Sequence, residues 1–365
     1  MQKKTATITW ISHRNFGTVL QAYALQRVLH SLGYDSHVID DRRVQEAFPR
    51  KKFSPLRILR SIGWLFPKRA SFRRSTEEVL RQYDDFKDRY IVIDSEWTDK
   101  RELSEKYDVF IAGSDQIWSP NVPFDDFYYL AFTGKSKVAY APSMGVSVYP
   151  DDCVAAVRPL LEAFDCLSVR EPQGAGILKE KFGLHAAVVS DPTMLLTRSE
   201  WEGLLPPPVH EESPYALCYF LTYNRKYIEQ VKAYCQVHSL KMKLLVVSPD
   251  FVGVADEDVY TGPAGFIQAV SGADIVFTDS FHGTIFSLIF EKDFRTFKRF
   301  DEASSINQNS RVEHLLASVD LADRLVDMTS EGLDASAVDY VRVREYLLRL
   351  REKSMNYLSD SLSKV

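Results

Sequence analysis

The feature that most constrains the fold is a short apolar segment, a polar turn and an apolar helix at residues 275–290. Residues 275–278 are apolar, β-branched or aromatic, which predicts a strand buried on both faces. Gly283 allows a sharp turn into a helix expected over 284–290. Units of this kind, repeated along a chain, build parallel sheets flanked by helices. The segment therefore predicts an α/β fold.

The turn of this unit carries the polar side chains Asp279, Ser280 and His282. They follow the carboxyl end of a strand, which is where open α/β sheets bind their ligands. They also precede a helix, whose first N–H groups favour anions. A histidine there can exchange a proton near neutral pH. The alternative is a capping Asp and Ser beside a packed His, and the segment alone leaves both interpretations open.

The beginning of the chain has the same alternation of elements. A strand is expected over 6–11, a helix follows and ends at Gly33, and a second strand is expected over 36–39. This is the first half of a Rossmann-like unit, but Gly17 is the only glycine in its first turn, so no dinucleotide is predicted. Asn15 and backbone N–H groups at the helix start are available to a ligand, unless this is an ordinary turn.

A third polar turn follows the strand expected over 107–112. It carries Ser114, Asp115 and Gln116 at the carboxyl end of that strand. Asp115 can bind hydroxyl groups or act as a base, or it can cap a turn.

The length of 365 residues favours two domains over one. Prolines at 206–208 and 214 indicate a boundary near 195–214. We predict an N-terminal domain over 1–200 and a C-terminal domain over 214–330. A long helix over 335–362 is expected to pack back on the first domain.

The segment 42–74 differs in composition from the rest of the chain. It holds eleven Lys or Arg and one acid, Glu46, so without this excess of ten the net charge of −5 becomes about −15. Apolar residues that include Trp64 and Phe66 alternate with the basic ones, and 56–66 fits a short amphipathic helix. Such a segment indicates contact with a membrane surface or an anionic polymer, or a packed insertion with a solvated basic rim.

Several classes of function have no support in the sequence. The mild net charge gives no case for nucleic acid, and no HExxH, EF-hand spacing or Cys/His cluster predicts a metal. No signal-peptide region or run of 18 apolar residues is present, so any membrane role is expected to be peripheral. The cysteines are far apart and fit a reducing cytoplasm: Cys153, Cys166, Cys218 and Cys235.

An ordered set of motifs resembles the polysaccharide pyruvyl transferase family. No single motif is specific, but together they run in family order from residue 15 to residue 311. They are Asn15-Phe-Gly-Thr-Val-Leu-Gln-Ala-Tyr-Ala-Leu25, Gly113-Ser-Asp-Gln-Ile-Trp118, Ser168-Val-Arg-Glu171, Asp191-Pro-Thr193, Asp279-Ser-Phe-His-Gly283 and Asn309-Ser-Arg311.

The resemblance implies an α/β fold of two Rossmann-like domains that face each other across a cleft, as in two-domain, GT-B-like glycosyltransferases. It also implies transfer of pyruvate from phosphoenolpyruvate to a sugar of a bacterial cell-surface glycan or its lipid-linked precursor, as a ketal. Phosphoenolpyruvate is then a donor substrate, and no cofactor is expected.

Carried onto this sequence, the resemblance makes His282 and Asp115 the acid and base, without deciding which is which. Arg170 and Arg311 are the expected cations for the donor, with N–H groups at the helix start near Gly283. Asp279 is expected to orient His282 or to cap the helix. The remaining expected substrate-binding residues are Asn15, Gly17, Ser114, Gln116 and Ser280.

Two other functions fit the same fold. One is a glycosyltransferase that uses a nucleotide sugar, and the other is a non-catalytic sugar-binding homologue. In each case the expected partners are small molecules and glycans, with peripheral contact at the inner face of the membrane through 42–74.

Overall fold

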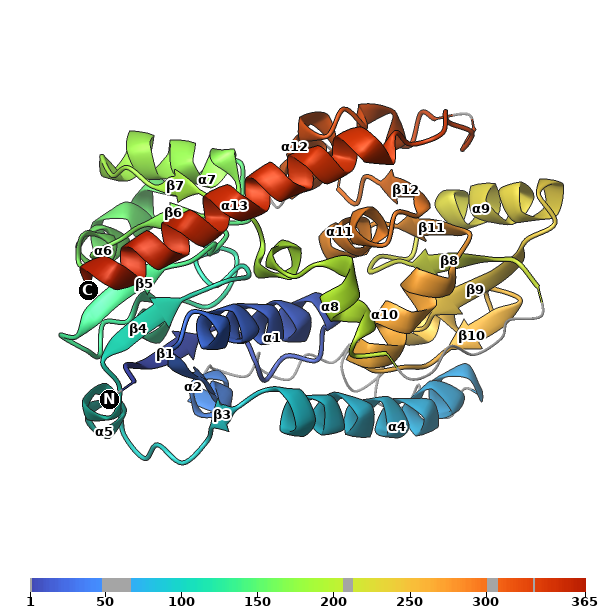
Figure 1. Cartoon of the computed structure of the whole chain (residues 1–365). Helices are drawn as coiled ribbons and strands as arrows, with labels where there is room; N and C mark the ends of the chain where they lie inside the picture. The colour runs from blue at the N-terminus through green and yellow to red at the C-terminus, as the bar shows by residue number, and fades with distance from the viewer. Residues whose placement is uncertain (1, 48–66, 206–212, 301–307, 331) are drawn as a thin grey trace.

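The chain forms two α/β units joined by packed helices (Figure 1). The computed structural model describes residues 2–47, 67–205, 213–300, 308–330 and 332–365. The long C-terminal helix α13 (Tyr340–Lys364) runs along both units, and the two termini lie close together on the first (Figure 1).

The first unit is built on a parallel sheet that has five strands in the described residues. Its order, β3-β2-β1-β4-β5, follows the Rossmann pattern, in which the order of strand addition reverses between β1 and β4. The strands are β1 (Lys4–Ile8), β2 (Asp35–Ile39), β3 (Ile93–Asp94), β4 (Val109–Ala112) and β5 (Ser136–Ala139). The helices of this part are α1 (Phe16–Ser31), α2 (Arg42–Ala47), α4 (Pro67–Tyr90), α5 (Lys100–Lys106) and α6 (Asp151–Glu162).

The second unit repeats the pattern with a parallel sheet of six strands among the described residues, ordered β10-β9-β8-β11-β12-β13. The order reverses between β8 and β11. The strands are β8 (Tyr215–Tyr219), β9 (Lys241–Leu245), β10 (Glu257–Val259), β11 (Ile275–Thr278), β12 (Asp293–Phe297) and β13 (Leu325–Val326). Their helices are α9 (Arg225–Val237), α10 (Pro263–Gly272), α11 (Phe281–Ile289) and α12 (Ser310–Ser318). The predicted fold class, α/β with two Rossmann-like units, is confirmed.

A smaller segment connects the two sheets. It contains a two-stranded parallel pair and several short helical turns. These are β6 (Ser168–Val169), α7 (Pro172–Ile177), the π-helical turn η3 (Leu178–Phe182), β7 (Ala187–Val188), η4 (Pro192–Leu195) and α8 (Arg198–Glu202).

One apolar core joins the two units. Phe16, the first residue of α1, stacks on Phe266 of α10 with the ring centroids 4.7 Å apart. Trp201 of α8 packs against Tyr23 on one unit and Phe286 on the other, with ring centroids 5.7 and 5.0 Å apart. Because aromatic side chains bury large areas, these contacts hold the two sheets in a fixed relation.

The C-terminal helix begins five residues later than the expected 335, because Asp339 is its N-cap and accepts from the N–H groups of Val341 and Arg342. It then contacts the connecting segment, where Ser354 Oγ accepts from the N–H of Ser190 at 2.9 Å, and the first unit, where the Tyr357 hydroxyl donates to Ala139 O at 3.0 Å.

Other element boundaries also differ from the sequence prediction. Helix α11 begins at Phe281 rather than 284, so His282 and Gly283 lie in its first turn. The predicted amphipathic helix over 56–66 lies outside the described residues. Within those residues, no helix is both long and apolar enough to cross a membrane.

Candidate functional site

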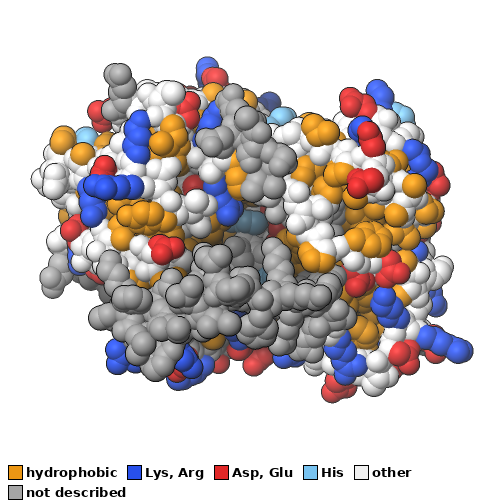
Figure 2. All heavy atoms as spheres, turned by 180° about the vertical axis from the view of Figure 1, so that it is seen from behind, with side chains coloured by type: hydrophobic (Ala, Val, Ile, Leu, Met, Phe, Trp, Pro, Cys, Tyr) orange, Lys and Arg blue, Asp and Glu red, His pale blue; other side chains and the backbone are white. Residues whose placement is uncertain are grey.

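A cleft of about 200 Å³ opens between the two units, at the points where both strand orders reverse. Loops after β1 and β4 form one wall, and loops after β8, β11 and β12 form the other. Viewed from behind, the molecule is hollowed near its middle, and His and basic side chains are visible there (Figure 2). Of the predicted site residues, the cleft is lined by Asn15, Asp115, Gln116, Asp279, Ser280, His282 and Arg311.

His282 enters the cleft from the first turn of α11 and packs on the first turn of α1. A Cβ atom built on Gly17 would lie 1.9 Å from His282 Nδ1 and 2.2 Å from Cγ. Because Gly17 has no side chain, the imidazole can pack directly on its backbone. Gly17 does not line the cleft itself.

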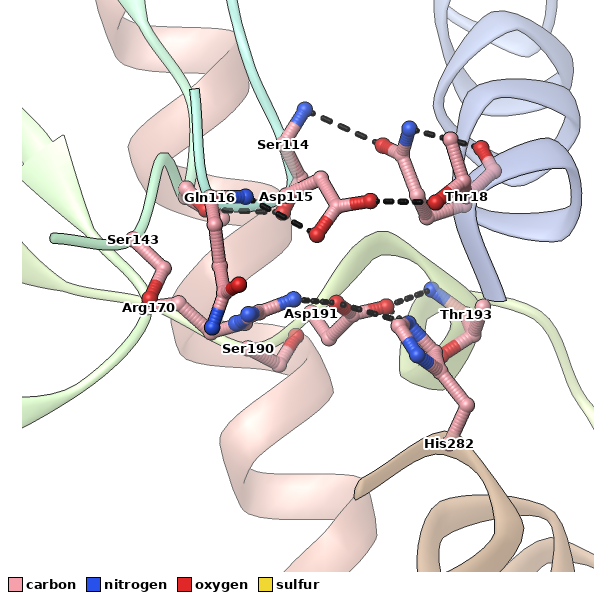
Figure 3. Close-up of polar contacts among 12 residues, drawn as sticks. Thr18, Ser114, Asp115, Gln116, Ser143, Arg170, Ser190, Asp191, Thr193 and His282 are labelled. Atoms are coloured by element: carbon pink, nitrogen blue, oxygen red, sulfur yellow. Dashed lines mark hydrogen bonds and ion pairs between the residues drawn. The ribbon is translucent and has the colours of Figure 1, made fainter. Parts of the chain in front are cut away.

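The carboxylate next to His282 belongs to Asp191, which follows β7 and begins η4. Asp191 Oδ2 lies 3.5 Å from His282 Nε2 and accepts from Arg170 Nη1 at 2.7 Å (Figure 3). Its Oδ1 accepts from the N–H and the hydroxyl of Thr193 at 3.0 and 2.7 Å. Burial acts to raise the pKa of Asp191, but His282, Arg170 and Thr193 outweigh burial and hold that pKa below its usual value.

Asp115 comes from the loop after β4 and faces α1 (Figure 3). Thr18 Oγ1 donates to its Oδ2 at 2.6 Å, and the N–H of Gln116 donates to its Oδ1 at 2.8 Å. Its φ of 68° lies in the left-handed region, which Asp tolerates better than most residues. The carboxylate is thus held at the cleft by one side-chain and one backbone donor.

Arg311 extends from α12 into the cleft and meets Gln116 of the other unit. With its amide oxygen turned to the guanidinium, Gln116 accepts from both terminal nitrogens of Arg311 at 2.9 and 3.0 Å. Arg311 Nη2 also donates to Gln308 at 2.8 Å. Burial, and then the charge of Arg170, lower the pKa of Arg311 to about 10. The guanidinium is therefore short of negative charge.

Arg170 is placed differently from the prediction. Its side chain is 2% exposed, is paired with Asp191, and lies outside the cleft lining. It borders a smaller neighbouring cavity of about 60 Å³, which Arg311 and Phe281 also line. Both guanidinium groups lie over the Phe281 ring, 4.6 Å (Arg170) and 5.5 Å (Arg311) from its centroid. Arg170 thus supports Asp191 and does not reach into the cleft.

Asp279 was expected to orient His282 or to cap α11, but its contacts show a different role, and the N-cap of α11 is Ser280. The two carboxylate oxygens of Asp279 accept from the N–H groups of Leu221 and Thr222, at 2.6 and 3.0 Å. It therefore ties the loop after β8 to the end of β11. Burial raises the pKa of Asp279 to about 6, although these N–H donors and Arg299 act to lower it.

Ser280, Gly283 and Ser114 have mainly structural contacts. Ser280 is the N-cap of α11 and accepts from the N–H of Gly283 at 3.3 Å, so that N–H is occupied. A Cβ atom on Gly283 would lie 2.3 Å from the Thr278 hydroxyl, so close packing requires glycine. Ser114 is fully buried and donates to Ala141 O, which corrects its expected contact with substrate.

Several cleft residues were not predicted from the sequence. Arg299 lines the cleft and donates through Nε to the Thr222 hydroxyl at 2.9 Å, and Lys298 pairs with Glu313 at 3.1 Å. Both lie just after β12, at the same sheet edge as the other site residues, which was a signal in the sequence. Trp10 and His13 add rings to the opposite wall.

Several buried polar atoms at and beside the cleft have no hydrogen-bond partner. They include Nε and Nη2 of Arg170, Oε2 of Glu171, Nε2 of His282 and Nε of Arg311. Such atoms are costly in a folded protein, and binding sites are where they are retained. Among the described residues, no group of three His, Cys, Asp or Glu is arranged to hold a metal ion.

Comparison with known families decides the relationship of the chain. The family model described as polysaccharide pyruvyl transferase matches residues 15–299. The chain belongs to the polysaccharide pyruvyl transferase family. Membership supports a transferase that modifies polysaccharides. A search of curated proteins found no match.

Solved structures that resemble the chain have low sequence identity to it. A UDP-GlcNAc 2-epimerase from Neisseria meningitidis bound to UDP-GlcNAc shares 9% identity, covers 100% of both chains and has a TM-score of 0.47. The Methanocaldococcus jannaschii UDP-GlcNAc 2-epimerase shares 11%, covers 98% of this chain and 93% of its own, and has a TM-score of 0.46. The E. coli heptosyltransferase WaaC with ADP shares 12%, covers 95% and 99%, and has a TM-score of 0.40.

Proposed function

We propose that this protein transfers pyruvate from phosphoenolpyruvate to two hydroxyl groups of a sugar, forming a ketal on a cell-surface glycan or its lipid-linked precursor. The observation that carries the proposal is the cleft itself, which His282, Asp115 and Arg311 line between the two units. Arg311 lacks enough negative charge around it to offset its burial. Membership of the family supports the proposal independently.

The donor carries a phosphate and a carboxylate, so its site needs cations and N–H donors. Arg311 and Arg299 line the cleft and can pair with such oxygens in a two-pronged geometry. Arg311 Nε has no hydrogen-bond partner, and an anion beside it would offset the burial that lowers its pKa. The cleft is therefore suited to a small anion with more than one negative group.

The proposed chemistry needs one acid and one base. A proton adds to the methylene carbon of phosphoenolpyruvate, the adjacent carbon becomes oxocarbenium-like, and a sugar hydroxyl bonds to it after losing its proton. Phosphate then leaves with its bonding electron pair, and a second hydroxyl closes the ketal and releases its proton. His282 and Asp115 are the groups we assign to these proton transfers. No resident metal or cofactor takes part in this scheme, so turnover is expected to survive EDTA.

Calorimetry with phosphoenolpyruvate and with UDP-sugars, at matched ionic strength, tests the donor. We expect saturable binding of phosphoenolpyruvate and a loss of about tenfold or more in Arg311→Met, because a buried charged hydrogen bond is worth roughly 1.5 to 3 kcal/mol. Arg225→Met is the matched control, because Arg225 lies on an exposed helix face, pairs with Glu229 at 2.7 Å and does not line the cleft. Binding of a UDP-sugar without phosphoenolpyruvate would favour a glycosyltransferase. Binding of neither would reject both donors.

We also propose that the basic segment 42–74 brings the enzyme to an acceptor at the membrane surface. Its eleven basic residues and interleaved apolar residues support this, in a chain that is otherwise acidic.

A further inference from the structure

The contact between Asp191 and His282 joins the connecting segment to the second unit. Asp191 belongs to the connecting segment after β7, whereas His282 lies in the first turn of α11 in the second unit. Asp191 is fully buried in its side chain and is held by Arg170 and by both donors of Thr193. Its carboxylate therefore has a fixed position, set by the connecting segment.

The geometry distinguishes the two ring nitrogens of His282. Nε2 faces Asp191 Oδ2 at 3.5 Å, which is longer than an ordinary hydrogen bond, and catalytic contacts of this kind often tighten when substrate binds. A neutral imidazole has one N–H and one lone pair. A nitrogen that faces a carboxylate carries the proton, which leaves the lone pair on Nδ1.

Gly17 leaves that lone pair accessible. The position of a Gly17 Cβ would lie 1.9 Å from Nδ1, 2.2 Å from Cγ and 2.4 Å from Cε1. Nearly equal distances to three adjacent ring atoms place the Gly17 backbone against the face of the ring. The Nδ1 lone pair lies in the ring plane, so Gly17 does not cover it.

We infer that Asp191 is the positioning residue of His282: it holds Nε2–H, so that Nδ1 exchanges the proton with substrate. This inference rests on the proposed function for its effect on turnover. Among the described residues, the other charged groups around the imidazole are Arg170 behind Asp191, and Arg311, Arg299, Lys298, Asp115 and Asp279 along the cleft. The carboxylate within ion-pair distance of the imidazole is that of Asp191, at 3.5 Å from Nε2.

The test combines turnover with the protonation pattern of the ring. ¹⁵N-histidine NMR of the full chain, with His282→Asn to assign the resonance, reports which nitrogen carries the proton. We expect Nε2–H in the native protein and a shift toward Nδ1–H in Asp191→Asn, because the new amide N–H₂ can donate to Nε2. Turnover in Asp191→Asn should fall about 10²-fold or more, while phosphoenolpyruvate affinity stays within a few fold.

Asp94→Asn is the matched comparison, since Asp94 is also a buried carboxylate paired with a cation, Lys106 at 2.7 Å, and does not line the cleft. We expect it to retain the native ring protonation and most of the turnover. A neutral His282 with its proton on Nδ1 in the native protein overturns the inference, even if no Asp191 variant folds. Unchanged ring protonation in a folded Asp191→Asn overturns it too. If the native protein releases no phosphate from phosphoenolpyruvate with any acceptor, the proposed function fails and the NMR result still decides the role of Asp191.

Discussion

At the scale of single residues, the contact between Gly17 and His282 makes a sharp prediction. In Gly17→Ala the new methyl group would overlap the imidazole, which must then leave its position. We expect turnover to fall at least tenfold and the free energy of unfolding to fall by about 1 to 3 kcal/mol, as for other overpacked sites. Steady-state kinetics and urea unfolding measure the two effects.

The control for this variant is Gly176→Ala. Gly176 lies in α7, and a Cβ there would meet nothing within 4 Å. Ala should be neutral or stabilise the protein by about 0.5 to 1 kcal/mol, because it favours helix more than Gly does. If Gly17→Ala changes turnover and the free energy of unfolding no more than Gly176→Ala does, the His282 ring does not pack closely on α1.

Asp279 predicts a pH dependence of stability. Its pKa in the folded protein is about 6, above the value of about 3.9 for an unfolded chain. The folded state therefore binds this proton more tightly, so the stabilisation is complete below about pH 4 and is lost as pH rises through 6. The loss amounts to at most about 3 kcal/mol.

Asp279→Asn isolates this effect. Other groups titrate equally in both proteins, so the stability of the native protein relative to the variant should decline between pH 4 and pH 7. The variant also loses one N–H acceptor, which adds an offset that does not vary with pH. Urea unfolding across that range measures the difference, and a constant difference would exclude the raised pKa.

The sequence could predict which residues lie at the ligand edge but not which way each side chain points. Asn15, Asp115, Gln116, His282 and Arg311 line the cleft. Ser114 is adjacent to Asp115 in the chain, yet its hydroxyl turns to Ala141 O. The partner of His282 could not be predicted, because Asp191 is 91 residues away and meets it only through the packing of the two units.

At the scale of elements, the start of α11 sets the position of His282. Ser280 caps this helix through the N–H of Gly283. Ser280→Ala should lower the free energy of unfolding by about 1 kcal/mol, as the loss of an N-cap does, while phosphoenolpyruvate affinity changes little. Thr197→Ala at the capping box of α8, away from the cleft, is the control for stability. A large loss of affinity without a loss of stability would make Ser280 a ligand residue instead.

The sequence predicted elements with a clear apolar pattern better than strands of two residues. The strand at 275–278 and the helix after it follow from their apolar pattern, and β11 spans those residues. The two-residue strands β3 and β13 carry too few side chains to show a pattern, and their pairing partners define them instead. Helix α13 starts late because the capping Asp339 overrides the apolar periodicity that begins before it.

At the scale of the whole molecule, the strand–helix pattern predicted an α/β fold with the first half of a Rossmann-like unit at its start. The family resemblance implied two Rossmann-like units, and both sheets have that strand order. Only the family resemblance predicted that the two units face each other. No local pattern encodes the contact of Phe16 with Phe266, which lie 250 residues apart in the sequence. The cleft exists because that aromatic packing aligns the two ligand edges.

The basic segment predicts an effect that belongs to the whole molecule. Each basic residue near an anionic bilayer contributes about 1 kcal/mol, so the protein should co-sediment with anionic vesicles at low salt and be released at high salt. Replacing the lysines and arginines of 50–60 by Gln should abolish the preference for anionic over neutral vesicles. The cleft of this variant should still bind phosphoenolpyruvate. Equal recovery on neutral and anionic vesicles would reject membrane contact through 42–74.

The most direct measurement of the central claim is phosphate release from phosphoenolpyruvate, with a panel of glycan acceptors, by the native protein and by His282→Asn. Asn keeps roughly the volume of the imidazole and one hydrogen bond, but it cannot exchange a proton near pH 7. The account predicts acceptor-dependent release by the native protein. For His282→Asn it predicts a folded protein that binds phosphoenolpyruvate within about tenfold and turns over about 10²- to 10⁴-fold more slowly. A folded His282→Asn with nearly normal turnover would contradict both the role of His282 and pyruvyl transfer in this cleft.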